Sequence, residues 1–579
     1  MALAGQAETV RLRPMIASRL LVLLTSAALL ASCASSPVSS SRLLASEDLA
    51  SSSYGLFLAG HNALNSGQGK TAGAFLEQAR ADGDDSEGRI SELAFTAALL
   101  QGDISQAAAL APNGPNATEA GKRMGRLVLA VEALAQDRPK VARPLLESET
   151  VGFPHKSAAA LLAPWAAAMA GEVDNSLVRP QVRSDNVVDY FGLLGQAQLY
   201  ERAKRYDEAE TDYKTLTGGD YSAERMFLGY GGFLERRGRR ADALALYGKG
   251  LTQYPRDNAL VAAQARASAG RKAPPPPTVK EGAALAVMAS STTMINAKQD
   301  QLALAYLHLA LRLDPALNGA WLMVGDVLTS AGETEAARLA YAKPPIGSPE
   351  FSGARAKMAW SYQAAKNPEM ALKLAREAAS NGDMDAKITL ADLLRTNDQF
   401  AESAEILTPL IAASPDWNLL FSRGIAYDRL GRWADGERDL QAALTQRPDD
   451  PEILNYLGYS WIDRGEHLDV ALGMIQKALG VNPNSGAMVD SLGWAYYRLG
   501  DYKKAVESLE RAVEMQAGEP DINDHLGDAY WRAGRRDEAG FQWHRVLTLE
   551  PDAKLKAAVE QKIAHGLDGP TPATRVATK

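Results

Sequence analysis

Three stretches in the C-terminal part of the chain share one pattern: Asn455-Tyr456-Leu457-Gly458-Tyr459-Ser460-Trp461, Asp490-Ser491-Leu492-Gly493-Trp494-Ala495-Tyr496 and Asp524-His525-Leu526-Gly527-Asp528-Ala529-Tyr530. In each stretch a leucine precedes a glycine, and an aromatic residue follows three positions after that glycine. Residues three apart lie on the same face of a helix. The glycine allows a second helix to come close, and the aromatic ring fills the space beside it. The pattern therefore predicts closely packed helices.

The glycine recurs at a nearly constant interval. Gly424, Gly458, Gly493 and Gly527 are separated by 34, 35 and 34 residues. A small residue follows each of them about one helix length later, at Gly436, Ala471, Ala505 and Ala539. A period of this length is typical of tandem helical hairpins, each of which leaves an apolar face that only the next hairpin can cover.

These features resemble the tetratricopeptide repeat family, whose unit is a hairpin of two antiparallel helices. The resemblance implies an all-α fold, namely a solenoid in which the hairpins form a superhelix. Weaker copies extend the frame upstream, because Gly325 and Ala359 are 34 residues apart and so are Ala197 and Gly231. We therefore expect repeats over most of the chain.

Stretches of distinctive composition divide the sequence into segments. Pro274 to Pro277 cannot form helix, because proline lacks the amide hydrogen and restricts the residue before it. We interpret this run as a break between two arrays. An alternative is a long loop inside one hairpin, with one helix starting near Glu281 and the other running from Leu302 to Pro315; a less favoured one is a polyproline ligand for another domain. The expected segments are 1–32 signal peptide, 33–53 lipidated Ser-rich tether, 54–272 N-terminal helical repeat array, 273–280 Pro-rich break, 281–551 C-terminal tetratricopeptide repeat array, 552–568 capping helix and 569–579 disordered tail.

The N-terminal segment has the features of an export signal. Arginines precede an apolar run from Leu20 to Leu30, which is too short to span a bilayer. The sequence Leu30-Ala31-Ser32-Cys33 then resembles the lipobox of bacterial lipoproteins, which implies cleavage before Cys33 and lipid attachment to it. Cys33 is the only cysteine. The alternative is a simple secretory signal with an incidental cysteine. Met15 offers a second possible translation start.

Composition argues against several functions. The net charge of −8 disfavours nucleic acid as a partner, since phosphate contacts need clustered lysine and arginine. The seven histidines lack zinc-site spacing, and Asp524-His525 is interpreted as a surface pair. We expect no enzyme activity, no cofactor and no metal. An enzyme with an unrecognised site in residues 80–185 is the alternative from another functional class.

The remaining candidate is a protein-binding surface. In the family that the chain resembles, the first helices of the hairpins line a concave groove. We call the recurring residues Gly424, Gly458, Gly493 and Gly527, and their counterparts in other repeats, the landmark positions. Counted from each landmark glycine, positions −3, +1, +4 and +5 would face the groove. These positions combine Trp, Tyr and Arg, which are common interface anchors, with carboxylates. The expected partner-binding groove residues are Asn455, Tyr459, Asp490, Trp494, Tyr497, Arg498, Asp524, Asp528, Trp531 and Arg532.

The run from Leu454 to Leu549 is also similar to a group of proteobacterial tetratricopeptide-repeat lipoproteins. That group includes the outer-membrane adaptor of a periplasmic carboxyl-terminal processing protease. The resemblance implies a scaffold that is lipid-anchored to the outer membrane, faces the periplasm, and has a processing protease and cell-wall hydrolases as protein partners. The alternative is an assembly or export factor for outer-membrane proteins or cell-envelope polymers.

Overall fold

The computed structural model describes residues 52–568 except 66, 83–84, 86–87 and 220–221. The regular structure of these residues is helical throughout, so the predicted all-α fold is confirmed. The signal peptide, Cys33, almost all of the predicted tether and the predicted tail lie outside the described residues. Within the described part, no helix is both long and apolar enough to span a membrane.

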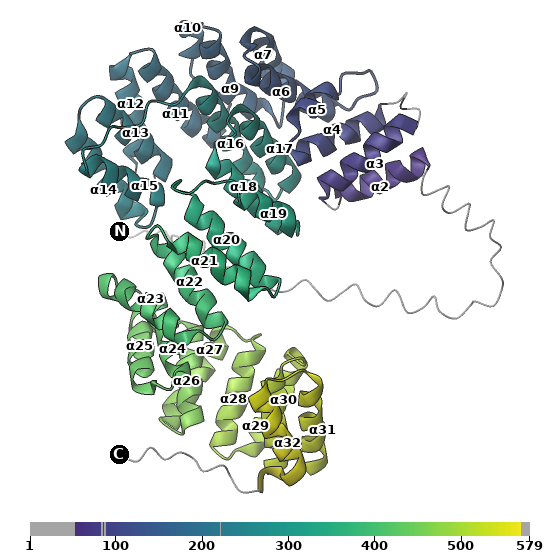
Figure 1. The fold of residues 1–579 in the computed structure, drawn as a ribbon, viewed down its shortest axis with the longest axis vertical. Helices are drawn as coiled ribbons and strands as arrows, with labels where there is room; N and C mark the ends of the chain where they lie inside the picture. Colours follow the sequence, from purple (N-terminus) through teal and green to yellow (C-terminus); the bar gives the residue numbers. More distant parts are fainter. Residues whose placement is uncertain (1–51, 66, 83–84, 86–87, 220–221, 569–579) are drawn as a thin grey trace, which may run out of the picture.

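The N-terminal helices form a curved array of antiparallel pairs, in purple and blue in Figure 1. The described residues of the range 80–185, for which an unrecognised enzyme site is the alternative, belong to the end of α3, to α4–α10 and to the connections between them. The helices are α2 (Ser53–Asn65), α3 (Gly69–Asp82), α4 (Arg89–Gln101), α5 (Ile104–Ala109), α6 (Glu119–Ala135), α7 (Pro139–Leu145), α8 (Ser148–Val151), α9 (Lys156–Met169), α10 (Val173–Ser176), α11 (Asn186–Arg202), α12 (Tyr206–Thr217), α13 (Glu224–Arg236), α14 (Arg240–Gln253) and α15 (Asn258–Ser268).

The later helices pair in the same way and extend in green and yellow to the lower end of Figure 1. They are α16 (Val279–Asn296), α17 (Asp300–Leu313), α18 (Asn318–Ser330), α19 (Thr334–Tyr341), α20 (Phe351–Ala364), α21 (Pro368–Ala379), α22 (Met384–Thr396), α23 (Phe400–Ala413), α24 (Trp417–Arg429), α25 (Trp433–Gln446), α26 (Pro451–Arg464), α27 (Leu468–Val481), α28 (Gly486–Arg498), α29 (Tyr502–Met515), α30 (Pro520–Arg532), α31 (Arg536–Thr548), α32 (Ala553–His565) and the short 3₁₀ helix η1 (Gly566–Asp568).

The landmark glycines lie where two helices of a pair approach most closely. A Cβ on Gly493 would be 2.5 Å from Leu509 of the second helix, and a Cβ on Gly527 would be 2.5 Å from Trp543. Side chains in a packed interior cannot accept such overlap without moving. The period seen in the sequence thus corresponds to a repeated helix contact, and the packing role inferred for the glycines is confirmed.

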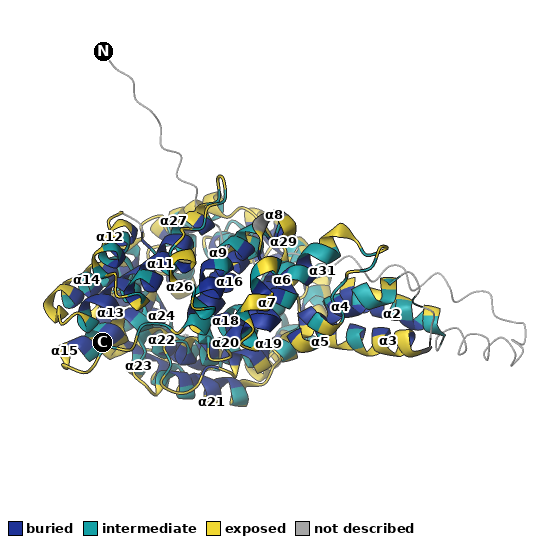
Figure 2. Ribbon diagram, turned by 90° about the horizontal axis from the view of Figure 1, so that it is seen from above, coloured by how far each residue is buried: buried dark blue, intermediate teal, exposed yellow. Residues whose placement is uncertain are grey.

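The hairpin α16–α17 lies on the inner side of the N-terminal array. It packs against α4, α6, α9 and α11, which are first helices of N-terminal pairs. Figures 1 and 2 both show α16 beside α9 and α11. One hydrophobic core joins the side chains of α2–α9 with those of α16–α18. At Gly282 in α16, a Cβ would be 2.1 Å from the buried ring of Trp165 in α9, so only glycine permits this contact.

The interpretation of residues 273–280 as a break between two arrays needs correction. The helices that follow the prolines pack back on the helices that precede them, so the two arrays share a core. The segment is also shorter than expected, since α16 already begins at Val279 with a capping box formed by Thr278 and Glu281. The alternative of a hairpin starting near Glu281 describes α16–α17 better, with the prolines ahead of it.

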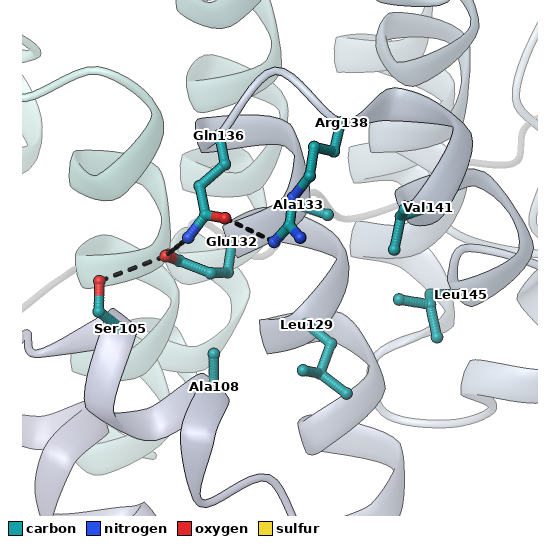
Figure 3. A pocket seen from close by; sticks show the side chains of 9 residues that line it. All are labelled: Ser105, Ala108, Leu129, Glu132, Ala133, Gln136, Arg138, Val141 and Leu145. Carbon is teal, nitrogen blue, oxygen red and sulfur yellow. Dashed lines mark hydrogen bonds between the residues drawn. The ribbon is translucent and has the colours of Figure 1, made fainter.

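Polar contacts also connect α17 with the N-terminal array. Arg312 donates two hydrogen bonds, of 2.7 and 3.0 Å, to the carboxylate of Glu132 in α6. Glu132 also accepts hydrogen bonds from Ser105 and Gln136, and these side chains line the pocket between α5, α6 and α7 in Figure 3. His308 donates to the carbonyl of Leu99 in α4 at 2.8 Å. The hairpin is therefore an integral part of the N-terminal half.

Candidate functional site

The candidate groove is formed by the first helices of the C-terminal pairs, with α26, α28, α30 and α32 at its end. Successive first helices contact each other: α26 contacts α28, and α28 contacts α30. Side chains at the same position in neighbouring repeats therefore lie side by side. This arrangement brings together the residues that the sequence predicted for the groove, but it leaves them unequally accessible.

An aromatic cluster lies at the centre of this face. The ring of Trp494 stacks on that of Tyr497, with centroids 4.6 Å apart, and on that of His525 at 4.2 Å. Tyr459 lies 6.4 Å from His525. Two buried polar atoms here, Nε1 of Trp494 and Oδ1 of Asn455, have no hydrogen-bond partner among the described residues. These aromatic side chains are half-buried, so they contact the neighbouring repeats while part of each side chain stays accessible.

His525 forms a buried ion pair with Asp490 of the preceding repeat. Its Nδ1 lies 2.9 and 3.1 Å from the two carboxylate oxygens of Asp490. Burial lowers the pKa of His525, but the carboxylates of Asp490, Asp524 and Asp528 outweigh burial and raise this pKa to about 9. The imidazole is therefore charged at neutral pH. The interpretation of Asp524-His525 as a surface pair was wrong, because the partner of His525 is Asp490 and its side chain is only 13% exposed.

Asp524 and Asp528 are buried and share a cation from the capping helix. The Nζ of Lys562 in α32 lies 2.7 Å from Asp524 and 2.8 Å from Asp528. Nε1 of Trp543 also donates to Asp528, at 3.1 Å. Burial and the neighbouring Asp524 raise the pKa of Asp528 to about 6. These carboxylates hold α32 in place. No pattern in the sequence predicted Lys562 as their partner.

Acid–base pairs link several successive first helices between α18 and α32. In each pair the acid belongs to one repeat and the base to the next. Asp490, Asp524 and Asp528 are largely buried and each contacts a basic side chain of the following first helix, so they are corrected from groove surface to contacts between repeats. The pairs are Asp326–Lys357, Asp428–Arg464, Asp463–Arg498, Asp490–His525 and Asp524–Lys562.

The remaining predicted residues lie at the margin of the groove. Arg498 donates to the backbone carbonyl of Asp463, and Arg532 lies 3.5 Å from the carbonyl of Leu567. Trp531 packs near Trp543, with ring centroids 5.4 Å apart. The sequence prediction missed Trp360 of α20, which is 42% exposed. The signal was present, because Trp360 follows the landmark Ala359 as Trp494 follows Gly493.

The described residues contain no group of three or more His, Cys, Asp or Glu side chains placed to hold a metal ion. The groups that this face offers are aromatic side chains and arginines, which suit the binding of another molecule.

Comparison with known proteins identifies the repeats. The sequence profile of the tetratricopeptide repeat matches residues 194–258, 388–451, 421–485, 463–520 and 491–553. A TPR repeat-containing protein of Pseudomonas aeruginosa is 30% identical over 169 residues, which are 29% of this chain and 28% of that protein. The chain thus spans less than a third of this relative.

The chain is also similar to solved structures. The match to the Cut9–Hcn1 hetero-tetramer of the APC/C covers 92% of this chain and 99% of that chain, with 16% identity and a TM-score of 0.38. The match to MamA covers 29% of this chain and 96% of that chain, with 23% identity and a TM-score of 0.25. From the matched profile and the helix pairs that carry it, residues 194–258 and 388–553 of this chain are tetratricopeptide repeats.

Proposed function

We propose that this protein is a lipid-anchored periplasmic adaptor that binds other proteins along the concave face of its C-terminal array. Tetratricopeptide repeats are protein-interaction scaffolds, which supports the general role. One observation favours the C-terminal face in particular: the hairpin α16–α17 occupies the inner side of the N-terminal array. The C-terminal face carries the half-buried aromatic cluster and the exposed Trp360.

The proposed partners are a periplasmic processing protease and the cell-wall hydrolases that it degrades. Their support is the resemblance of the C-terminal repeats to adaptor lipoproteins. Holding a protease and its substrate on one scaffold raises the local concentration of each for the other. A lipid on Cys33, which lies outside the described residues, would confine this encounter to the membrane surface.

Replacing Trp360 by Ala is expected to reduce partner recovery at least fivefold when the protein is purified from solubilised membranes. Exposed aromatic residues are frequent interface anchors. Because Trp360 is 42% exposed, its truncation removes less buried packing than the truncation of a core tryptophan. Recovered proteins are identified by mass spectrometry.

The matched control is Phe541→Ala on the outer helix α31, where the aromatic side chain is 73% exposed. Equal recovery with both variants would contradict the groove assignment. Recovery of envelope-assembly or export proteins in place of a protease would instead support the assembly-factor alternative.

Replacing Cys33 by Ala is expected to move the protein from the membrane to the soluble periplasmic fraction. Acylated cysteine is the only anchor that we propose, and the described residues hold no spanning helix. The fractions are compared by immunoblotting, and circular dichroism of the released variant checks its helix content. Retention of the variant in the membrane fraction would refute the lipid anchor.

A further inference from the structure

The proline-rich segment is not a bare linker but lies in a groove of the N-terminal array. Pro274, Pro275 and Pro277 line one cavity together with side chains of α11, α13 and α15. The residues of α13 that face them include Leu228, Gly232 and Arg236. Relative to Gly231 these are positions −3, +1 and +5, which are among the positions expected to line a concave groove. The segment therefore lies where a bound peptide would lie.

Two arginines hold the backbone of this segment. Arg202 at the end of α11 donates to the carbonyl of Pro277, and Arg236 at the end of α13 donates to the carbonyl of Pro274, both at 3.0 Å. The two arginines occupy the same position in successive repeats. Three residues make one turn of polyproline II, about 9 Å, and packed helices are spaced by about 8–10 Å. One turn of the peptide thus matches one step of the array.

The side chains around the groove are arranged to hold an extended peptide. Glu201 orients Arg236 through two hydrogen bonds of 2.7 Å, which leaves Nη1 of Arg236 directed at Pro274. Gly232 stands where the C-terminal first helices carry Tyr459, Trp494 and Asp528, so the groove here has room for a backbone. Because proline has no backbone N–H, a run of prolines places no backbone hydrogen-bond donor in the groove.

One buried atom shows that the present occupant fits incompletely. Gln198 lines the same cavity and is only 6% exposed, yet its Oε1 has no hydrogen-bond partner among the described residues. Leaving a buried acceptor unsatisfied costs about 1–3 kcal/mol. A peptide with a backbone N–H facing Gln198 would remove that penalty, whereas a run of prolines cannot.

We propose that the groove of α11, α13 and α15 is a binding site for an extended segment in the polyproline II conformation. Residues 274–277 of the same chain occupy this site, and a proline-containing segment of a partner protein displaces them. This site is separate from the C-terminal face proposed above. The cis segment competes strongly because its effective concentration is on the order of 1 mM. If the internal segment itself has an intrinsic Kd of about 0.1 mM for the groove, that competition weakens the binding of a partner peptide roughly tenfold.

The test uses a fluorescent peptide with the sequence of residues 273–278 and the full chain. The variant P274G/P275S/P276G/P277S vacates the groove and is expected to bind the peptide about ten times more tightly than the unaltered protein, as measured by fluorescence anisotropy. Adding Arg202→Ala to that variant should abolish the gain, whereas adding Arg205→Ala should preserve it. Arg205 is the matched control because it pairs with Glu208 on the surface. Equal binding by the vacated and unaltered proteins would overturn the proposal.

A second measurement covers the case in which the fourfold substitution disturbs α16. In the otherwise unaltered chain, Arg202→Ala should speed amide hydrogen exchange at Ala273 and Thr278 at least fivefold, because the segment loses one of its two backbone anchors. Arg205→Ala should leave these rates unchanged. Identical exchange in both variants would also overturn the proposal.

Discussion

Raising the pH from 6.5 to above 9 is expected to destabilise the C-terminal repeats by about 3 kcal/mol through the deprotonation of His525 alone. The pKa of this imidazole is raised from 6.5 to about 9 in the folded chain. A raised pKa means that the folded state binds the proton more tightly than the unfolded state. The stabilisation is fully present below pH 6.5 and is lost as the pH rises through 9. The magnitude follows from 1.36 kcal/mol for each pKa unit.

Thermal unfolding followed by circular dichroism measures this effect. For an array of this size, about 3 kcal/mol corresponds to a fall in Tm of roughly 6–12 °C. Tyrosine and lysine side chains also titrate at alkaline pH, so His525→Gln is the control. The Tm of this variant should fall less between pH 6.5 and a pH above 9 than the Tm of the unaltered protein, and the difference is the contribution of His525. The Asp490 carboxylate facing His525 is retained in that variant. A histidine resonance that titrates near pH 6.5 in place of 9 would contradict the buried ion pair.

The fold could be predicted from the sequence to the extent that it depends on local contacts. Gly493 and Gly527 revealed the repeat because each contact that they permit lies within one hairpin, at a fixed distance along the chain. The position of α16–α17 could not be predicted in this way. Its contacts with α4 and α6 join residues more than 150 apart in the sequence, and no periodicity reports such pairing.

The candidate site was predicted in outline for the same reason. Counting from the landmark glycines identifies the face of the helix, but it does not tell whether a side chain there meets a partner or the next repeat. Asp490 and His525 belong to successive repeats, so the sequence showed two separate polar residues where the structure has one ion pair. Trp360 was overlooked because its repeat has alanine at the landmark position, which made the register less visible.

Replacing Arg312 by Ala is expected to loosen the hairpin α16–α17 from the N-terminal array, with a loss of about 2–3 kcal/mol. Glu132 is only 5% exposed, and the change would leave its charge with the hydrogen bonds from Ser105 and Gln136 alone. Removing one partner of a buried pair is costly because the other charge remains desolvated. The expected loss is smaller than the roughly 3–5 kcal/mol typical of fully buried pairs, because the side chain of Arg312 is 37% exposed. Hydrogen exchange in α17 and α6 measures the loosening.

Two further variants separate charge burial from the mere loss of a contact. Arg312→Ala combined with Glu132→Gln should recover most of the stability, since the glutamine keeps an acceptor for Ser105 while removing the buried charge. Arg256 precedes α15, and Arg256→Ala breaks its exposed pairs with Asp385 in α22 and with Asp416, which should cost less than about 1 kcal/mol. If Arg312→Ala changed exchange in α17 no more than Arg256→Ala, the hairpin would be held by its apolar core alone. The ion pair of Arg312 with Glu132, whose carboxylate lines the pocket in Figure 3, would then be incidental to the docking of the hairpin.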